Sequence, residues 1–319
     1  MLYLFIQSML FLAAAGLMAC TIAASLGRTY WMCELATHFR VQYAALFLLS
    51  ALGFLLLHNP VSAAIAALGS MVNLAAILPA YGRMTLPFAI KEQPRGKTIK
   101  ALLLNVNFRN QNYAKTLDYI RLVKPDLVAI VEVNAAWSKQ LESLRPVYPF
   151  IVGFRGCRGW GLMLLSRLPL EKTVIVKPRA RRIPYVRAEV LVDGRPIAVI
   201  VTHPYAPVTK RYAAHRNRQF EQLAAVALEQ TAPVILLGDL NVSPWSPNFK
   251  QLLKSSRLVD SRSGFGVQPT WPTSNRWLQI PIDHCLVSSS VTVRDHRIGP
   301  DVGSDHLPVM VNIQLPNSY

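Results

Sequence analysis

Polar side chains of the kinds that bind metal ions or transfer protons recur in this sequence where short apolar runs end. Six such points lie in the C-terminal two thirds of the chain: Asn105, Glu132, His203, Asp239 with Asn241, Asp283, and Asp305 with His306. A polar group at the end of a buried strand is costly unless it is paired or bound to a ligand. We therefore expect these points to converge on one site. Phosphoester hydrolysis uses such groups to neutralise phosphoryl oxygens, orient a water molecule and assist the leaving group.

Individual roles follow from the chemistry of each side chain. Glu132 is a hard carboxylate suited to Mg²⁺, and Asn105 can lend a carbonyl oxygen to the metal or its water shell. We expect Mg²⁺ as the cofactor, with Mn²⁺ as the alternative. Asp239 is the candidate to position or deprotonate the attacking water. Asn241 follows two residues later, on the same face of an extended segment, where it can orient that water or the phosphate.

The elements that must position these residues alternate between apolar strands and polar helices. Strands are predicted at 98–106, 126–133, 161–166, 185–192, 196–202, 233–237, 283–288, 291–297 and 307–315, and helices at 110–123 and 210–230. Hairpins occur together with crossovers, which favours an α/β sandwich with helices outside the sheets over a single doubly wound sheet.

Three motifs in this region are more specific than the individual residues. They are Gly-Asp-Leu-Asn at 238–241, Ser-Asp-His-Leu-Pro-Val at 304–309 and Gly-Leu-Met-Leu-Leu-Ser-Arg at 161–167. In this order they resemble the endonuclease/exonuclease/phosphatase superfamily, which includes deoxyribonucleases, abasic-site endonucleases, sphingomyelinases and inositol polyphosphate phosphatases. The resemblance covers about 98–315. It implies a four-layer α/β sandwich of two mixed sheets flanked by helices, with the active site at one end of the sheets.

The resemblance also implies roles for the histidines and the later aspartates. His306 would contact the scissile phosphate, with Asp283 fixing its tautomer, and Asp305 would be a further metal ligand. His203 matches a histidine that stabilises the phosphoryl group or protonates the leaving group. Asn107 departs from the family, since several relatives carry an acidic residue there, and this speaks against a strong second metal site.

The N-terminal quarter of the chain has the composition of a membrane segment. Residues 1–82 contain only three Asp, Glu, Lys or Arg side chains, namely Arg28, Glu34 and Arg40. Their uncharged stretches predict three transmembrane helices at about 2–26, 41–58 and 61–81, the last two separated by a tight turn at Asn59-Pro60. A basic linker at 83–97 would then lead to a catalytic domain at 98–319.

Charge around the predicted spans indicates an orientation. The flanking Lys and Arg residues all fall on one side of a three-span topology: Arg28, Arg40, Arg83, Lys91, Arg95, Lys97 and Lys100. The positive-inside rule favours a cytoplasmic catalytic domain. We therefore expect a multi-pass protein of a bacterial-type plasma membrane, with the lipid bilayer as one partner. The cysteines lack CxxC spacing, which argues against a zinc cluster and against a disulfide framework.

The substrate is the least constrained part of the prediction. The chain after residue 82 carries 32 of the 34 basic and 16 of the 17 acidic residues, a net charge of +16, which favours a phosphorylated partner. A membrane tether favours a lipid-linked or headgroup phosphate. The alternative is a DNA or RNA nuclease, and an inactive binding module is a further one. The nuclease alternative rests on arginines and aromatics near the site in sequence: Arg109, Arg155, Arg158, Arg181, Arg182, Arg211, Arg216 and Arg218 with Trp160, Tyr185, Tyr205, Tyr212 and Trp245.

Overall fold

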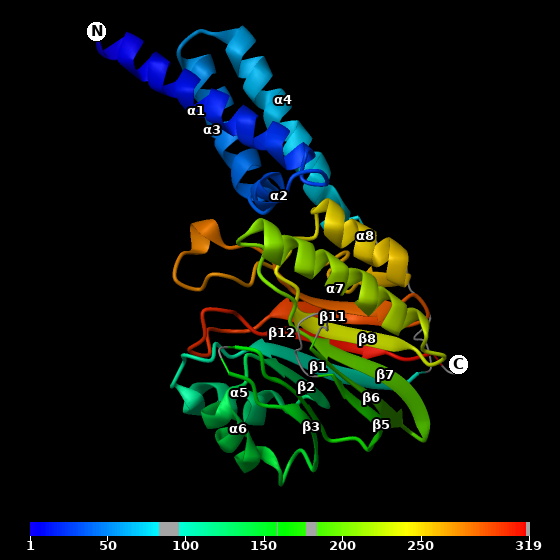
Figure 1. Cartoon of the computed structure of the whole chain (residues 1–319). Helices are drawn as coiled ribbons and strands as arrows, with labels where there is room; N and C mark the ends of the chain where they lie inside the picture. Colours follow the sequence, from blue (N-terminus) through cyan, green and yellow to red (C-terminus); the bar gives the residue numbers. More distant parts are fainter. Residues whose placement is uncertain (83–95, 158, 177–183, 317–319) are drawn as a thin grey trace.

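The structure is a computed structural model, and it describes residues 1–82, 96–157, 159–176 and 184–316 of the chain. A bundle of apolar helices stands on one side of a larger α/β body (Figure 1). The bundle contains α1 (Leu2–Ser25), α2 (Trp31–Thr37), α3 (Arg40–Leu56) and α4 (Pro60–Ile77), which continues into the short helix η1 (Leu78–Ala80). Most of the predicted linker, residues 83–95, lies outside the described residues.

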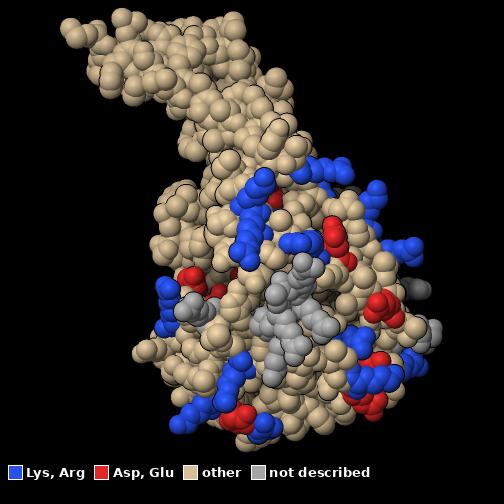
Figure 2. Space-filling model, viewed as in Figure 1, with Lys and Arg blue, Asp and Glu red and all other residues tan. Residues whose placement is uncertain are grey.

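Helix lengths in the bundle match part of the membrane prediction. Two helices, Leu2–Ser25 and Pro60–Ala80, are long and apolar enough to cross a membrane, and α2 with α3 forms a third candidate bent by 64°. The predicted turn is present, since Pro60 begins α4 and the side chain of Asn59 accepts a hydrogen bond from the backbone N–H of Ser62 at 3.2 Å. Along the length of the bundle, the face in Figure 2 shows no charged side chains, whereas they are frequent on the body.

The segment at 28–40 differs from the loop expected there, because it contains α2. Arg40, counted as a loop charge, instead begins α3 and is buried within the bundle. Its guanidinium donates to the side-chain oxygen of Asn73 in α4 at 3.1 Å, and Asn73 donates to the hydroxyl of Thr21 in α1 at 3.0 Å. These buried hydrogen bonds join three helices at the end of the bundle that faces the body.

Two six-stranded sheets form the centre of the body. The first has the order β11-β12-β1-β2-β4-β3 and the second β5-β6-β7-β8-β10-β9. The strands are β1 (Thr98–Asn105), β2 (Leu127–Val131), β3 (Phe150–Phe154), β4 (Leu162–Ser166), β5 (Leu170–Val176), β6 (Tyr185–Val192), β7 (Arg195–Thr202), β8 (Val234–Asp239), β9 (Leu258–Asp260), β10 (Asp283–Ser288), β11 (Thr292–Ile298) and β12 (Val309–Gln314). Both sheets are mixed, since β1–β2 and β7–β8 are parallel and their other pairs antiparallel.

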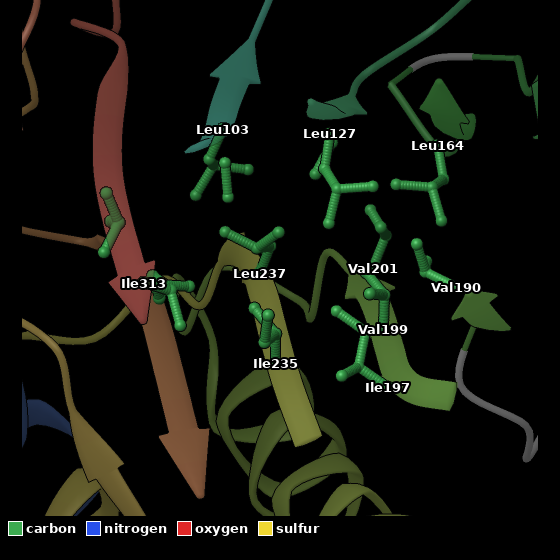
Figure 3. Packing of buried hydrophobic residues seen from close by; sticks show 14 of the residues in the cluster. Leu103, Leu127, Leu164, Val190, Ile197, Val199, Val201, Ile235, Leu237 and Ile313 are labelled. Atoms are coloured by element: carbon green, nitrogen blue, oxygen red, sulfur yellow. The ribbon is translucent and has the colours of Figure 1, made fainter. Parts of the chain in front are cut away.

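The facing sides of the two sheets form the main hydrophobic core (Figure 3). Leu103 and Leu127 of the first sheet point toward Val201 and Leu237 of the second, and all four are buried. Alternate residues of the same strands point outward, as the period of two in a strand requires. Those outward residues are also apolar, so each sheet needs a further covering layer.

Helices supply that covering layer on both outer faces. Helices α5 (Tyr113–Val123) and α6 (Ala135–Leu141), followed by η2 (Glu142–Leu144), pack on the first sheet. Helices α7 (Lys210–Leu228) and α8 (Pro247–Ser256) pack on the second sheet. A further short helix, η3 (Arg276–Leu278), lies in the loop before β10. The predicted sandwich of two mixed sheets flanked by helices is confirmed.

The helical bundle contacts the body through named side chains. Glu34 in α2 forms a buried ion pair with Arg216 in α7. Ala44 of α3, Ile77 of α4 and Trp245 of the body form a small buried apolar cluster. These contacts place α2 and the lower ends of α3 and α4 directly against the body.

Candidate active site

The sheet topology brings the predicted site residues to one end of the sandwich, where the central strands end or begin. Asn105 ends β1, Glu132 follows β2, His203 follows β7 and Asp239 ends β8. These strands run in the same direction within each sheet. Asp283 begins β10, which is antiparallel to β8, and pairs in register with Asp239. The loop carrying Asp305 and His306 precedes β12, which is antiparallel to β1, and so arrives at the same end.

Close packing explains two glycines of the sequence motifs. A Cβ atom on Gly238 would lie 2.1 Å from the carbonyl oxygen of Thr202, and one on Gly161 would lie 1.7 Å from that of Val133. Neither distance is sterically allowed, so only glycine lets the neighbouring backbone approach. Gly238 thereby sets the position of Asp239, the next residue.

A histidine–aspartate pair lies at the centre of the site. Nδ1 of His306 is 2.8 Å from a carboxylate oxygen of Asp283, and both side chains are buried. The backbone N–H of Asp283 is 3.3 Å from the hydroxyl of Thr270. With its Nδ1 bonded to Asp283, the imidazole directs Nε2 toward Asp239, whose nearest carboxylate oxygen is 3.7 Å away. The pair predicted from the resemblance is therefore assembled.

Asp239 lies between two imidazoles. Its Oδ2 is 3.5 Å from Nε2 of His203, and its Oδ1 accepts the backbone N–H of Asn241 at 2.9 Å. That last bond closes a tight turn at the end of β8 and holds Asn241 at a φ of 52°. The side-chain amide of Asn241 then lies 3.3 Å from Nε2 of His203. Three of the predicted catalytic residues are thus mutual neighbours.

Glu132 and Asn105 connect the first sheet to this group. The amide nitrogen of Asn105 donates to Glu132 and to Asp239, at 3.0 Å in both cases, while its oxygen accepts the backbone N–H of Asn107. Glu132 adopts a φ of 64°, a sparsely populated conformation for a residue with a side chain. The metal role expected for the Asn105 oxygen stays a prediction.

Asp305 is held by two donors. The side-chain amide of Asn107 donates to one carboxylate oxygen at 2.9 Å, and the indole N–H of Trp271 donates to the other at 3.1 Å. Asn107, the position where several relatives carry an acid, therefore contacts the Asp305 carboxylate as a neutral partner.

Oxygen donors predominate around the site, which suits a hard divalent cation. Carboxylates of Glu132, Asp239 and Asp305 line one pocket, and hard cations such as Mg²⁺ and Mn²⁺ prefer oxygen ligands. Ligand atoms of Asp239, Asp283 and His306 also lie within 4.8 Å of one another. Asp283 and His306 are already hydrogen-bonded to each other, and the metal role of Glu132, Asp305 and Asn105 stays a prediction. The residues present fit a divalent metal.

Burial and mutual charge set the ionisation of the central groups. Burial opposes the charge on Asp239, but His306, His203 and the N–H of Asn241 outweigh it and lower its pKa to about 2. Burial also opposes protonation of His306, yet the carboxylates of Asp283 and Asp239 raise its pKa to about 10. Asp239 is therefore an anion at neutral pH and His306 a cation.

The site opens into a pocket of about 600 Å³ that extends to the helical bundle. Glu132, His203, Asp239, Asn241, Asp305 and His306 all line it. Leu35, His38 and Phe39 from α2 and the turn after it line it as well. Sequence reasoning missed these three residues, since nothing in the local pattern connects them to a site formed by distant parts of the chain.

Other site residues were also not predicted. Thr270 and Trp271 orient Asp283 and Asp305, and they lie in a loop without a recognisable motif. Ser304 donates to the carbonyl of Asn105 at 2.7 Å. Its position in the Ser-Asp-His motif was the available signal. His284, which was not assigned a role, is buried on the other side of β10 with Nε2 2.7 Å from the carbonyl of Val242.

Two residues that the nuclease hypothesis assigned to nucleic-acid contacts are instead buried between the bundle and the body. Arg216 is fully buried and paired with Glu34, and Trp245 is buried against α3 and α4. Neither can reach a nucleic acid in this structure, so their predicted stacking or phosphate contacts are wrong. Arg158, Arg181 and Arg182 lie outside the described residues. Trp160, Tyr205 and Tyr212 do line the pocket, and Trp160 and Tyr205 have ring centroids 4.5 Å apart.

Comparison with known proteins agrees with the family resemblance noted in the sequence. The model of the Endonuclease/Exonuclease/phosphatase family matches residues 102–306. An inositol phosphosphingolipids phospholipase C of Saccharomyces cerevisiae is 29% identical, over 43% of this chain and 34% of that protein. The chain therefore spans about a third of the length of the curated relative it matches.

Solved structures share the fold at low sequence identity. An endonuclease/exonuclease/phosphatase from Bacteroides vulgatus is 17% identical with a TM-score of 0.59, covering 69% of this chain and 99% of its own. TDP2 of D. rerio, complexed with a single strand DNA product, is 17% identical with a TM-score of 0.57, covering 68% of this chain and 99% of its own.

Proposed function

Since the chain belongs to the endonuclease/exonuclease/phosphatase family and is therefore a metal-dependent phosphoesterase, we propose that it hydrolyses a phosphate ester or anhydride carried by a membrane lipid. One observation carries the choice of substrate. The pocket lined by Asp239 and His306 is also lined by Leu35 and Phe39 of the apolar N-terminal bundle. A phosphate at a bilayer surface would lie within reach of this site, whereas a soluble nuclease gains nothing from such a position.

The proposed chemistry assigns each side chain a task that its environment supports. Asp239, kept ionised between two imidazoles, orients or deprotonates the attacking water. His306, protonated and fixed by Asp283, donates from Nε2 to a phosphoryl oxygen. Asn241 and His203 orient the phosphate and assist the leaving group.

Glu132, Asn105 and Asp305 hold the divalent cation, proposed to be Mg²⁺ with Mn²⁺ as the alternative. When bound, it supplies neutralisation of negative charge on the phosphoryl oxygens. The remaining polar contacts, from Asn107 and Trp271 to Asp305, keep that carboxylate in place.

The relative from Saccharomyces cerevisiae supports a lipid substrate, because that protein is an inositol phosphosphingolipids phospholipase C. A nuclease is the second candidate. The single strand DNA product bound to TDP2 and the aromatic side chains Trp160, Tyr205 and Tyr212 at this pocket favour it. An inactive binding module is disfavoured, since the described residues hold the whole predicted catalytic set in contact.

We further propose that the bundle anchors the protein in a bacterial-type plasma membrane, with residues 1–82 as the anchor and 98–319 as a cytoplasmic catalytic domain. Exposed basic residues on α7 and α8 support an anionic lipid surface as neighbour: Lys210, Arg211, Arg218, Lys250 and Lys254. A fluorescent protein fused after Tyr319 should then fluoresce, and an alkaline phosphatase fused there should be inactive. The opposite pair of results would place the catalytic domain outside.

A panel of substrates tests the proposed activity. Purified full-length protein in lipid nanodiscs is given Mg²⁺ and, in parallel, long-chain lipid phosphates and diphosphates, phospholipids, plasmid DNA and single-stranded DNA. We expect release of phosphate or a phosphorylated headgroup from at least one lipid, and loss of that release in Asp239→Asn. Hydrolysis of DNA with every lipid untouched would favour the nuclease.

A further inference from the structure

The lining of the catalytic pocket has two chemically different parts. Acidic, amide and imidazole side chains form the part described above. The other part is apolar and comes from two sources: Leu35 and Phe39 of the bundle, and Pro207, Val208 and Ile280 of the body. A phosphate with a small polar headgroup would use only the first part. The second part is therefore available to an apolar portion of the ligand.

The residues from the bundle face the pocket together because of their spacing. Leu35, His38 and Phe39 are related as i, i+3 and i+4, and His38 keeps a right-handed helical backbone conformation at the end of α2. Side chains with this spacing lie on one face of a helical turn. Glu34, one residue before Leu35 in α2, is paired with Arg216 in α7 and accepts a hydrogen bond from Ser246 at 2.5 Å. These contacts fix the rotation of α2 and with it the face presented to the pocket.

His38 is a polar residue in this apolar part of the pocket lining. Its side chain is 7% exposed, and its Nδ1 has no hydrogen-bond partner among the described residues. A buried polar atom without a partner costs about 1–3 kcal/mol. His38 is therefore a buried polar residue within an otherwise largely apolar part of the lining.

The rim of the pocket continues toward the region where a bilayer would lie. Val208 lines the pocket and is 63% exposed. The loop that carries Ile280 also carries Trp277, which is 87% exposed, and Leu278. This loop is attached to the bundle, since the side-chain amide of Gln42 in α3 donates to the carbonyl of Trp277 at 3.1 Å. Exposed aromatic and apolar side chains beside a membrane helix are typical of the membrane interface.

We propose that the apolar part of the pocket is a subsite for the hydrocarbon chain next to the phosphate of a membrane amphiphile. The N-terminal bundle then completes the active site, and α2 determines which phosphates are bound well. The inference rests on the proposed function for the kind of phosphate that is hydrolysed. The subsite itself can be tested by ligand binding alone, without hydrolysis. The chain lies along Leu35, Phe39 and Val208 while the phosphate lies at Asp239 and His306.

Binding of alkylphosphonates of increasing length tests the subsite without hydrolysis. Isothermal titration of the full-length protein in amphipol, with Mg²⁺ present, compares ethyl-, butyl- and octylphosphonate. Each buried methylene adds to affinity, so we expect octylphosphonate to bind at least tenfold more tightly than ethylphosphonate. In Leu35→Ser, Phe39→Ser and Val208→Asp this ratio should fall below threefold, whatever the affinity for ethylphosphonate itself.

Met32→Ser is the matched control, because Met32 is on the same helix, 64% exposed and absent from the pocket lining. It should keep the wild-type ratio. Val208→Asp changes an exposed rim residue, so it tests the subsite even where a variant of α2 fails to fold. Equal binding of all three phosphonates to the wild type, or a ratio that survives in Val208→Asp and the folded α2 variants, would overturn the proposal. Chain-length dependence without hydrolysis of any lipid phosphate would instead reject the proposed function and leave the subsite standing.

Discussion

Glu34 and Arg216, 182 residues apart in the chain, form an ion pair that is closed to solvent, with side chains 1% and 0% exposed. The same guanidinium donates to the backbone carbonyl of Asn241 at 3.3 Å. A helix of the N-terminal bundle is therefore connected, through one arginine, to the loop that carries a candidate catalytic residue. The bundle and the catalytic domain are structurally coupled, so the bundle is more than a tether.

Removing the acid of this pair should destabilise the protein strongly. Glu34→Gln leaves the Arg216 charge buried without a counter-ion, which typically costs about 3–5 kcal/mol. We expect a clearly lower midpoint of thermal unfolding in nanodiscs. The double variant Glu34→Leu/Arg216→Met removes both charges and should recover most of the loss. A Glu34→Gln protein that unfolds at the wild-type temperature would show that the pair is not closed in solution.

Asp239→Asn should remove the chemical step while preserving the fold. The amide keeps the shape of the side chain but cannot accept a proton, and loss of a general base typically lowers kcat by about 10²–10⁴-fold. Asp193→Asn is the matched control, since Asp193 is an exposed partner of Lys97 remote from the site. Single-turnover hydrolysis measures both. Asp239 would lose its assigned role if its variant kept more than about a tenth of the wild-type rate.

Activity should depend on a divalent cation held by Glu132. Excess EDTA should abolish hydrolysis and added Mg²⁺ should restore it. Glu132→Gln removes one anionic ligand, so we expect half-maximal activation to need at least about tenfold more Mg²⁺. Titration of the initial rate with Mg²⁺ gives this value. Undiminished hydrolysis in EDTA would contradict the metal assignment.

Stability should decrease in mild acid because of His296 in β11. Burial and the nearby Arg262 lower its pKa from 6.5 to about 3, and neighbouring His284 is also shifted down. Between pH 6.5 and 3 the unfolded chain binds a proton at this position that the folded chain does not. Each pH unit in that window therefore costs about 1.4 kcal/mol of stability, and above pH 6.5 the effect is absent.

The variant His296→Asn tests this, since Asn retains a partner for the Ser261 hydroxyl that now contacts Nδ1 at 2.9 Å. Its unfolding temperature should decline less steeply than that of the wild type below pH 6.5. Parallel curves for the two proteins across pH 4–8 would assign the acid sensitivity to other groups.

Sequence reasoning could group the candidate site residues because each lies at, or within a few residues of, an end of a strongly apolar strand. A buried run such as Leu127–Val131 is recognisable without knowing its neighbours, and the sandwich then brings the polar ends together. The edge strands β3, β5 and β9 and the helices α6 and α8 were not predicted. The strands and α6 are short or largely exposed, so their local patterns carry little hydrophobic periodicity. Helix α8 does have an apolar face, with Phe249 and Leu252 buried, and that signal was missed.

The environment of α2 could not be predicted for a different reason. Seven residues between two membrane-type helices look like a connecting loop, and the contact that makes them a structured element lies in α7. Glu34 appeared as one of three isolated charges and Arg216 as a surface arginine suited to nucleic acid. Only the tertiary structure shows that the two charges neutralise each other. The predicted phosphate-binding role of Arg216 is therefore wrong.

The claim that catalysis acts on phosphate presented by the protein's own bilayer is tested most directly by surface dilution. The protein is reconstituted in vesicles, and the lipid phosphate identified by the substrate panel is supplied either in those vesicles or in separate, protein-free vesicles at equal bulk concentration. We predict that the initial rate follows the mole fraction of substrate in the protein's own membrane, and that substrate in separate vesicles is hydrolysed at least about tenfold more slowly. Equal rates from both sources would contradict a site that draws its substrate from the membrane in which it is anchored.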